Sequence, residues 1–243
     1  MKSKYAQVET IGNVAGRVII VGDIHGCLTQ LQELLAAAAF VKGRDAVISV
    51  GDLVNKGPDS VGVVRLLRGI GARAVLGNHD AKLLKLRKKL RKNGALTGKQ
   101  RSSSLALLAT TLPQDVEEYL SRLPHILRIP AHNLLVVHAG LHVQRPLEQQ
   151  LVDEVTTTRN LVAHGPGPHT ASEDTTEGVP WASLWRGPET VLFGHDARRG
   201  LQRYPYAIGL DTRCVYGGEL TAVVYPGERL IAVPGWCSLP SKV

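Results

Sequence analysis

Apolar runs alternate with helical patterns over the first third of the chain. Three runs rich in Val, Ile, Leu and Ala predict buried strands over residues 17–21, 45–50 and 73–76. The segments between them, residues 28–40 and 59–70, carry apolar side chains at helical spacing. This β-α-β-α-β order predicts parallel strands joined by right-handed crossovers.

The rest of the chain has a less regular pattern. Residues 113–123 predict one more helix, and five further apolar runs predict strands over residues 134–137, 190–193, 207–210, 220–225 and 230–233. No helical pattern separates the last three strands, so we expect an antiparallel addition that forms a second sheet packed on the first. Residues 164–180 are rich in Gly, Pro, Ser and Thr, which predicts a long loop.

Polar residues follow the ends of the predicted strands. The motifs are Gly-Asp-Ile-His-Gly at 22–26, Gly-Asp-Leu-Val-Asn-Lys-Gly at 51–57 and Gly-Asn-His-Asp at 77–80, and two later strands end at His138 and His195. Because ligand sites in parallel sheets lie at the carboxyl ends of strands, we expect these polar residues to converge at one edge. Carboxylate, amide and imidazole groups without thiolates suit Mn²⁺, Fe²⁺, Zn²⁺ or Mg²⁺. Two such ions ~3.5–4 Å apart can clamp a phosphoryl group, which suggests phosphoester chemistry.

Composition adds few constraints to this picture. The chain has 243 residues, of which 44% are hydrophobic and 21% are charged, as in an average soluble protein. Three dispersed cysteines argue against a disulfide framework and against a thiolate zinc site. The chain lacks an apolar run long enough to span a bilayer, and its first residues lack the apolar stretch of a signal peptide. We therefore expect a cytoplasmic protein with no membrane partner.

The net charge of +8 is concentrated in one segment. Residues 82–92 contain seven Lys and Arg side chains, and Leu83, Leu86 and Leu90 recur at helical spacing among them. This pattern predicts an amphipathic helix with one basic face. The basic face is either a solvated surface or a field that attracts a polyanion such as a nucleotide, polyphosphate or an RNA end.

The motifs resemble those of the metallophosphoesterase superfamily, which includes the Ser/Thr phosphoprotein phosphatases. Within it, the sequence is most similar to the ApaH-like phosphatases, relatives of bacterial symmetrical diadenosine tetraphosphatase. The details that carry this closer resemblance are Cys27, Gly57-Pro58, Asp80 and the segment Gly-Leu-Asp-Thr-Arg-Cys-Val-Tyr-Gly-Gly-Glu-Leu-Thr-Ala at 209–222. The resemblance implies an α/β fold with α+β elements at the C-terminal end. The expected architecture is a four-layer sandwich, with two mixed β-sheets flanked by helices, as a single domain over residues 1–243.

The resemblance also implies a set of metal ligands. One metal ion would be held by Asp23, His25 and Asp52. The other would be held by Asp52, Asn78, His138 and His195. The expected cofactors are two divalent ions, Mn²⁺ first, with Fe, Zn, Co or Mg as alternatives. Cleavage would be an in-line attack by a metal-bound hydroxide, with His79 protonating the leaving oxygen.

The second motif departs from the wider family, which carries Asp-Arg where this chain has Asn55-Lys56. Asn55 can accept a hydrogen bond from His79 but brings no charge, and Asp80 is the candidate that compensates. Lys56 would bind phosphate as a point charge rather than as a bidentate fork. Further candidates for substrate binding are Arg186, Arg198, Arg213 and Tyr216.

These observations predict a metal-dependent hydrolase of phosphoanhydride bonds. The expected substrates are dinucleoside polyphosphates, as for a bis(5'-nucleosyl)-tetraphosphatase. The alternatives are an inorganic polyphosphatase, an mRNA-cap hydrolase acting on an RNA 5' end, and a Ser/Thr protein phosphatase. A non-catalytic nucleotide-binding or RNA-binding protein predicts lost ligands, whereas every ligand position is filled here. The oligomeric state stays open.

Overall fold

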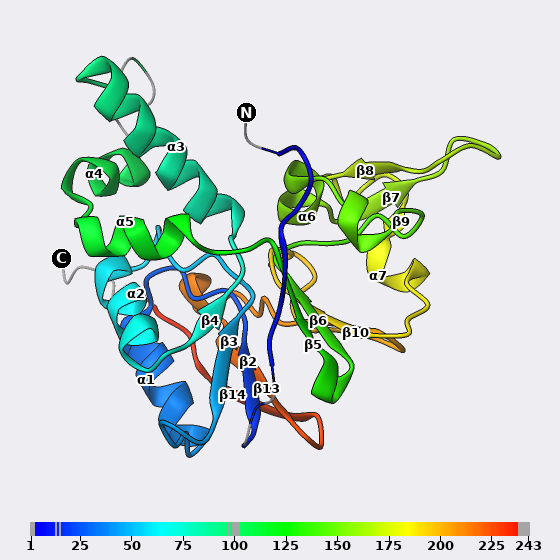
Figure 1. The fold of residues 1–243 in the computed structure, drawn as a ribbon, viewed down its shortest axis with the longest axis horizontal. Coiled ribbons are helices and arrows are strands. Elements are labelled where there is room, and N and C mark those ends of the chain that lie inside the picture. Colours follow the sequence, from blue (N-terminus) through cyan, green and yellow to red (C-terminus); the bar gives the residue numbers. More distant parts are fainter. Residues whose placement is uncertain (1–2, 13, 15, 97, 99–102, 238–243) are drawn as a thin grey trace.

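One β-sheet contains the three strands predicted from the first third of the chain (Figure 1). In the computed structural model, which describes residues 3–12, 14, 16–96, 98 and 103–237, its strand order is β14-β13-β2-β3-β4. The strands are β2 (Val18–Val21), β3 (Ala46–Ser49), β4 (Arg73–Ala74), β13 (Glu219–Tyr225) and β14 (Arg229–Pro234). The first three are parallel, as predicted; β13 pairs antiparallel with β2, and β14 pairs antiparallel with β13.

A second sheet has the strand order β1-β5-β6-β10-β12-β11. Its strands are β1 (Val8–Thr10), β5 (Ile126–Ile129), β6 (Leu134–Val137), β10 (Thr190–Phe193), β11 (Gln202–Tyr204) and β12 (Ala207–Gly209). The expectation that the three tail strands form a second, antiparallel sheet is wrong: β13 and β14 join the first sheet, and β12 pairs parallel with β10 in the second. The reason is that β11 forms an antiparallel hairpin with β12 at the sheet edge, and this hairpin returns the chain parallel to β10.

The predicted loop over residues 164–180 contains two short strands. They are β8 (Thr170–Ser172) and β9 (Val179–Pro180), which pair antiparallel with β7 (Asn160–Val162) in a small third sheet. These strands are too short and too polar for the apolar pattern to predict them. A side chain supports the pairing, because Asn160 Nδ2 donates to Glu177 O over 2.6 Å.

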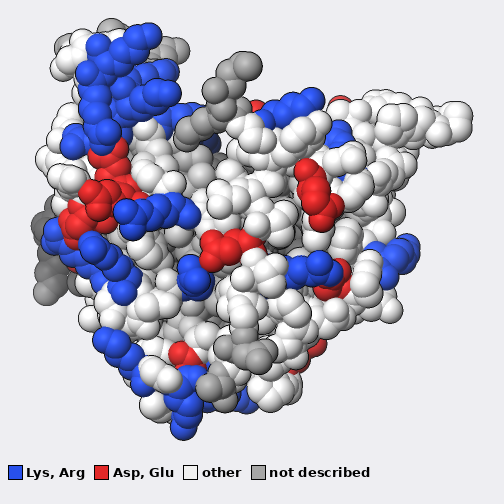
Figure 2. All heavy atoms as spheres, in the orientation of Figure 1, with Lys and Arg blue, Asp and Glu red and all other residues white. Residues whose placement is uncertain are grey.

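Helices cover the outer face of the first sheet (Figure 1). They are α1 (Leu28–Ala37), α2 (Ser60–Gly69), α3 (Asn78–Asn93), α4 (Ser104–Thr111) and α5 (Gln114–Ser121). The predicted basic helix forms the greater part of α3, and α4 has no counterpart among the predictions. Figure 2 shows Lys and Arg side chains gathered over α3, with acidic side chains beside them over α5. Among the described residues, no helix is both long and apolar enough to cross a bilayer.

The side-chain alternation of β2 explains why the two sheets stack. Val18 and Ile20 point into a core shared with the second sheet, whereas Ile19 and Val21 pack against the helices. The outer face of the second sheet packs on α6 (Val152–Thr157) and α7 (Trp181–Leu184). Further 3-10 turns lie at η2 (Pro130–His132), η3 (Leu147–Gln149) and η4 (Cys214–Tyr216). The result is the predicted order of helices, sheet, sheet and helices.

Candidate metal centre

The first motif follows β2 and places two polar side chains in the interior. Asp23 and His25 are 3% and 4% exposed. Both oxygens of Asp23 accept from the backbone N–H of His195 over 3.2 Å. His25 has a φ of +46°, in the left-handed region that non-glycine residues rarely adopt. Such backbone strain persists only where the surrounding structure imposes it, which is common at functional sites.

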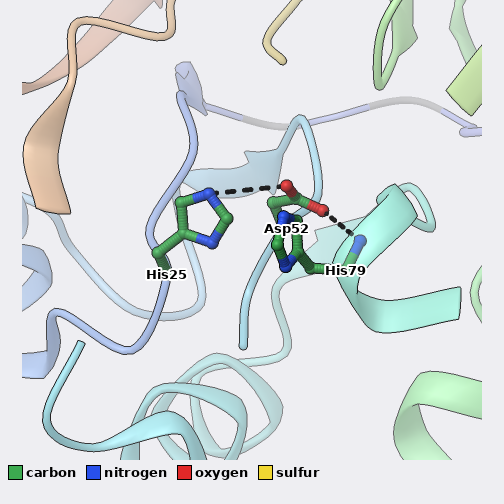
Figure 3. A group of neighbouring side chains, drawn as sticks. All are labelled: His25, Asp52 and His79. Atoms are coloured by element: carbon green, nitrogen blue, oxygen red, sulfur yellow. Dashed lines mark hydrogen bonds and ion pairs between the residues drawn. The ribbon is translucent and has the colours of Figure 1, made fainter. Parts of the chain in front are cut away.

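The second motif places Asp52 at the centre of the site. Asp52 also has a positive φ, of +50°, and is 2% exposed. Its Oδ1 accepts from the backbone N–H of His79 over 2.9 Å, and its Oδ2 lies 3.5 Å from His25 Nε2 (Figure 3). Oδ1 also lies 3.5 Å from His138 Nε2. The carboxylate therefore faces side chains from both sheets.

The third motif begins α3. Asn78 is the first residue of the helix, and its Oδ1 lies 3.2 Å from His138 Nε2. Asp80 is fully buried, and its oxygens accept from three backbone N–H groups, those of Leu53, Val54 and Gly77, over 3.0–3.2 Å. Its carboxylate is thus committed to holding the second motif against the start of α3, rather than to a contact with His79.

The hydrogen bond between Asn55 and His79 runs opposite to the expected direction. Asn55 Oδ1 accepts from Ser104 Oγ over 2.8 Å, which leaves Nδ2 to face His79 Nδ1 at 2.8 Å. Because an amide nitrogen can only donate, His79 Nδ1 is the acceptor. A neutral His79 therefore carries its proton on Nε2. Sequence reasoning could not show this, because Ser104 lies in the unpredicted helix α4.

The two later histidines enter the site from β6 and β10 of the second sheet. Their rings meet edge to face, with centroids 5.1 Å apart. His138 Nδ1 donates to Val50 O over 2.9 Å, because a carbonyl can only accept. The Nε2 of His195 is buried without a hydrogen-bond partner among the described residues. His195 also has a positive φ, of +67°.

Close backbone packing requires glycine beside two of these carboxylates. A Cβ added to Gly194 would lie 1.9 Å from Asp23 Oδ1, and one added to Gly77 would lie 2.2 Å from Asp52 Oδ1. Neither contact leaves room for a side chain. The glycines of the motifs therefore allow strands from both sheets to approach the same carboxylates.

Burial dominates the electrostatics of the site. It raises the pKa of Asp52 to about 7 and raises the pKa of Asp23 well above its usual range, with the nearby Asp211 adding to the latter. Burial likewise lowers the pKa of His138 to about 4 and that of His79 to about 3, with Lys56 and Lys82 adding to the second shift. Carboxylates resist ionisation here and imidazoles resist protonation, so bound cations would favour the ionised carboxylates.

The donor atoms fit divalent cations. With its proton on Nδ1, His138 presents a lone pair from Nε2 to the oxygens of Asn78 and Asp52, so three acceptors face one another. His25 likewise donates from Nδ1 to Val54 O over 3.2 Å and presents Nε2 to the site. Two groups of side chains have ligand atoms within 4.8 Å of one another: His25, Asp52 and His79, and Asp23, Asp52 and His138. A cation among these acceptors would satisfy them and the buried Nε2 of His195.

All six predicted ligands except His138, which is fully buried, line one cavity of about 250 Å³. The remaining lining residues that bear on chemistry are Lys56, His79, Lys82, Arg159, Glu173, Asp211 and Tyr216. Lys56 Nζ lies 2.8 Å from His25 Nε2 and 5.1 Å from the centre of the Tyr216 ring. The structure therefore brings Lys56 and Tyr216 to the same cavity as the predicted ligands.

The three candidate arginines lie away from this cavity. Arg186 donates to Ser183 O over 2.8 Å, Arg198 donates to Thr175 Oγ1 over 3.2 Å, and Arg213 precedes η4. None of them is among the described residues that line the site. The structure does not bring these arginines to the predicted ligands.

Sequence reasoning missed Arg159 and Asp211. Arg159 directly precedes β7 and is held by two carbonyls, those of Glu173 and His195, each at 3.0 Å. Its segment is short and irregular, so no pattern in the sequence could have found it. Asp211 is 6% exposed and follows the apolar run of β12, in the same way that Asp23 follows β2. This shared position after an apolar strand is the signal in the sequence that could have identified Asp211.

Comparisons with known proteins agree with this geometry. The pattern of the calcineurin-like phosphoesterase family matches residues 16–199. The symmetrical bis(5'-nucleosyl)-tetraphosphatase of Psychromonas ingrahamii is 33% identical over 268 residues, which cover 88% of this chain and 95% of that protein. The asymmetrical bis(5'-nucleosyl)-tetraphosphatase PrpE of Oceanobacillus iheyensis is 29% identical, with 89% and 92% covered. The crystal structure of a proposed diadenosine tetraphosphatase superposes with a TM-score of 0.88 at 62% identity, over 96% of this chain and 100% of that one.

Proposed function

Because this chain belongs to the calcineurin-like phosphoesterase family, we propose that it is a metal-dependent hydrolase that cleaves the phosphoanhydride bonds of dinucleoside tetraphosphates. One observation carries the proposal: oxygen and imidazole ligands converge with Lys56, Lys82 and Arg159 around a single cavity. Relatives that cover most of the chain are named for this substrate class, which supports the choice of a dinucleoside tetraphosphate.

Two divalent cations, Mn²⁺ first among the candidates, would be held by the predicted ligands. When bound, they would polarise the phosphoryl group and activate the attacking water. Asp52 lies between the two ligand groups and is the residue that both have in common. The Nδ1 hydrogen bonds of His25 and His138 keep each Nε2 lone pair turned to the site.

His79 is placed to donate a proton to the leaving oxygen. Its ring packs edge to face against His25, with centroids 4.9 Å apart, and it has a ring nitrogen within 4.8 Å of ligand atoms of His25 and Asp52. Asn55 donates to Nδ1 of the neutral ring, so the doubly protonated ring that acts as an acid requires the Asn55 amide to turn and present Oδ1 to Nδ1–H. Burial and two lysines hold the pKa of His79 low, which makes the protonated ring a strong acid. The anionic substrate would offset this depression as it binds.

Lys56 and Arg159 are the cations placed to bind phosphate oxygens. Arg159 has a side chain that is 20% exposed, and carbonyls on both sides hold its guanidinium at the cavity wall. A planar guanidinium can bind two phosphate oxygens at once, whereas the Lys56 ammonium acts as a point charge. A substrate with many phosphate oxygens suits this unequal pair better than a single phosphomonoester does.

The test is incubation of the purified protein with Mn²⁺ and diadenosine tetraphosphate, followed by chromatography of the nucleotides. ADP as the sole product means symmetrical cleavage, which we expect. ATP plus AMP means asymmetrical cleavage by the same chemistry. No nucleotide product with Mn²⁺, Fe²⁺, Zn²⁺, Co²⁺ or Mg²⁺ would overturn the proposal.

A comparison of rates tests the substrate class. Polyphosphate, capped RNA and a phosphopeptide should each be hydrolysed more slowly than diadenosine tetraphosphate under the same conditions. If one of them were hydrolysed faster, the proposal of metal-dependent hydrolysis would stand, but that compound would replace diadenosine tetraphosphate as the proposed substrate.

A further inference from the structure

A second cavity lies next to the metal centre, between α3 and α4. Its volume is about 440 Å³, and its described lining includes His79 at one end and Lys89 at the other. His79 and Lys82 line both this cavity and the metal-centre cavity. The two cavities are therefore neighbours, and the imidazole that is placed to donate a proton stands between them.

We propose that this cavity, the α3–α4 groove, binds the nucleotide that leaves during hydrolysis. The inference rests on the proposed function and specifies where the second half of the substrate lies. In phosphoanhydride hydrolysis the bond between the attacked phosphorus and its bridging oxygen breaks, and that oxygen departs with the leaving nucleotide and takes up a proton. Because His79 is the placed donor, the leaving nucleotide must lie on its side of the site, where the groove begins.

The charges of the groove suit the phosphates of that nucleotide. Lys82, Lys85 and Lys89 line it, and among the described residues none of the three forms an ion pair with a carboxylate. By contrast, Arg87 and Arg91 on another face of α3 pair with Glu117 of α5. The α3 cations that pack on α5 are thus paired with a carboxylate, whereas those that line the groove are not.

The spacing of the three lysines gives the groove a direction. They recur at intervals of three and four residues, which places them on one face of the helix. At about 1.5 Å of rise per residue, the row extends roughly 10 Å from the metal centre along α3. A diphosphate that leaves His79 would meet one ammonium after another along this row.

The groove also has apolar lining that phosphate does not need. Leu86 and Leu105 face it from α3 and α4, alongside the aliphatic stems of the lysines. An apolar surface bordered by ammonium groups suits a nucleobase joined to phosphates better than it suits a bare phosphate chain. We therefore assign the groove to a nucleoside diphosphate arm, with the base on the leucines.

The experiment compares two double variants that change the net charge equally. K85Q/K89Q removes two groove lysines, whereas K88Q/K92Q removes two lysines of α3 that do not line the groove. Calorimetric titration of the Mn²⁺-loaded full-length protein with ADP, and the KM for diadenosine tetraphosphate, are measured for both and for the parent. We expect K85Q/K89Q to weaken ADP binding and raise KM by about tenfold, with the matched control within twofold of the parent. Thermal unfolding of each variant confirms that it is folded.

The outcomes separate the groove from the proposed function. Equal affinities for ADP in both double variants would overturn the groove assignment, even if the protein hydrolyses diadenosine tetraphosphate. A parent protein that binds ADP through Lys85 and Lys89 but releases no product would overturn the proposed function and support the groove. Pyrophosphate should bind more weakly than ADP, and equal affinities would overturn the assignment of the base to the leucines.

Discussion

Strand β3 has a buried carboxylate near each of its ends, and the two stand in opposite environments. Asp45 precedes the strand and accepts from Arg17 Nη2 over 2.6 Å and from Arg44 Nε over 3.1 Å. The Arg17 guanidinium holds the pKa of Asp45 well below its usual range. Asp52 follows the strand, and burial raises its pKa to about 7.

The contrast shows which end of the strand serves stability and which serves binding. Asp45 has cationic partners from the chain itself, and its side chain is fully buried among them. Asp52 shares the interior with Asp23 and Asp211, and its pKa stays raised although Lys56 and Lys82 lie nearby. Asp52 thus depends on cations that come from outside the chain.

The largest effect is expected from Asp52→Asn. The amide keeps an oxygen to accept from the backbone N–H of His79 but removes the charge that both ligand groups share. Turnover of diadenosine tetraphosphate should fall by roughly 10³-fold or more. Manganese content, measured by mass spectrometry, should fall with it. The metal-free variant should unfold at a higher temperature than the metal-free parent, because a buried carboxylate is gone. If the variant kept the turnover of the parent, Asp52 would not be a ligand that both groups share.

His79→Asn should separate proton donation from metal binding. We expect turnover of diadenosine tetraphosphate to fall by about 10²–10⁴-fold, the usual contribution of a general acid, with unchanged manganese content. Hydrolysis of phenyl phosphate should fall much more, because its leaving oxygen is far more basic than that of a nucleoside diphosphate and depends more on the proton. Equal losses on both substrates would contradict the assignment of His79 as the acid.

Metal removal should lower stability through the same carboxylates. Mn²⁺ at one hundred times its dissociation constant adds about 2.7 kcal/mol to the free energy of unfolding. For a chain of this length that corresponds to a rise in Tm of roughly 5–10 °C, measured by calorimetry with Mn²⁺ against chelator. The Asp52→Asn variant serves as the control, since its Tm should respond much less.

The smallest effect is expected from Asp45→Asn, at the opposite end of β3. The free energy of unfolding should fall by about 1–3 kcal/mol at pH 7, with unchanged turnover and manganese content. Because the folded pKa of Asp45 is lowered, its stabilisation is complete above the ordinary aspartate pKa of ~4 and is lost as the pH falls from there through the folded pKa. Urea unfolding at pH 7 and pH 3 should therefore show a difference between variant and parent that shrinks with acid. An equal difference at both pH values would mean that the charge of Asp45 is not the cause.

The sequence was most informative where a polar residue ends an apolar strand. Asp23, Asp52, His138 and His195 all lie at such positions, and the parallel order of β2, β3 and β4 follows from the helices between them. Local periodicity is sufficient there, because each strand determines where its own last side chain lies.

The features that were missed depend on contacts between distant segments. Arg159 reaches the site because carbonyls of Glu173 and His195 hold it, and Ser104 determines which atom of Asn55 faces His79. The pairing of β12 with β10 and the ion pair of Asp45 with Arg17 also join segments that are far apart in the sequence. No pattern within one segment encodes such contacts, so only the folded chain reveals them.

The position of β13 has a consequence for the timing of activity during protein synthesis. This strand, near the C-terminal end of the described chain, lies between β14 and β2, and the N–H of Gly22, just before Asp23, donates to Thr221 O over 2.9 Å. A ribosome makes β2, β3 and β4 early, but one edge of β2 stays unpaired until residue 225 has emerged. We therefore expect the nascent chain to stay catalytically silent until β13 has emerged and paired with β2.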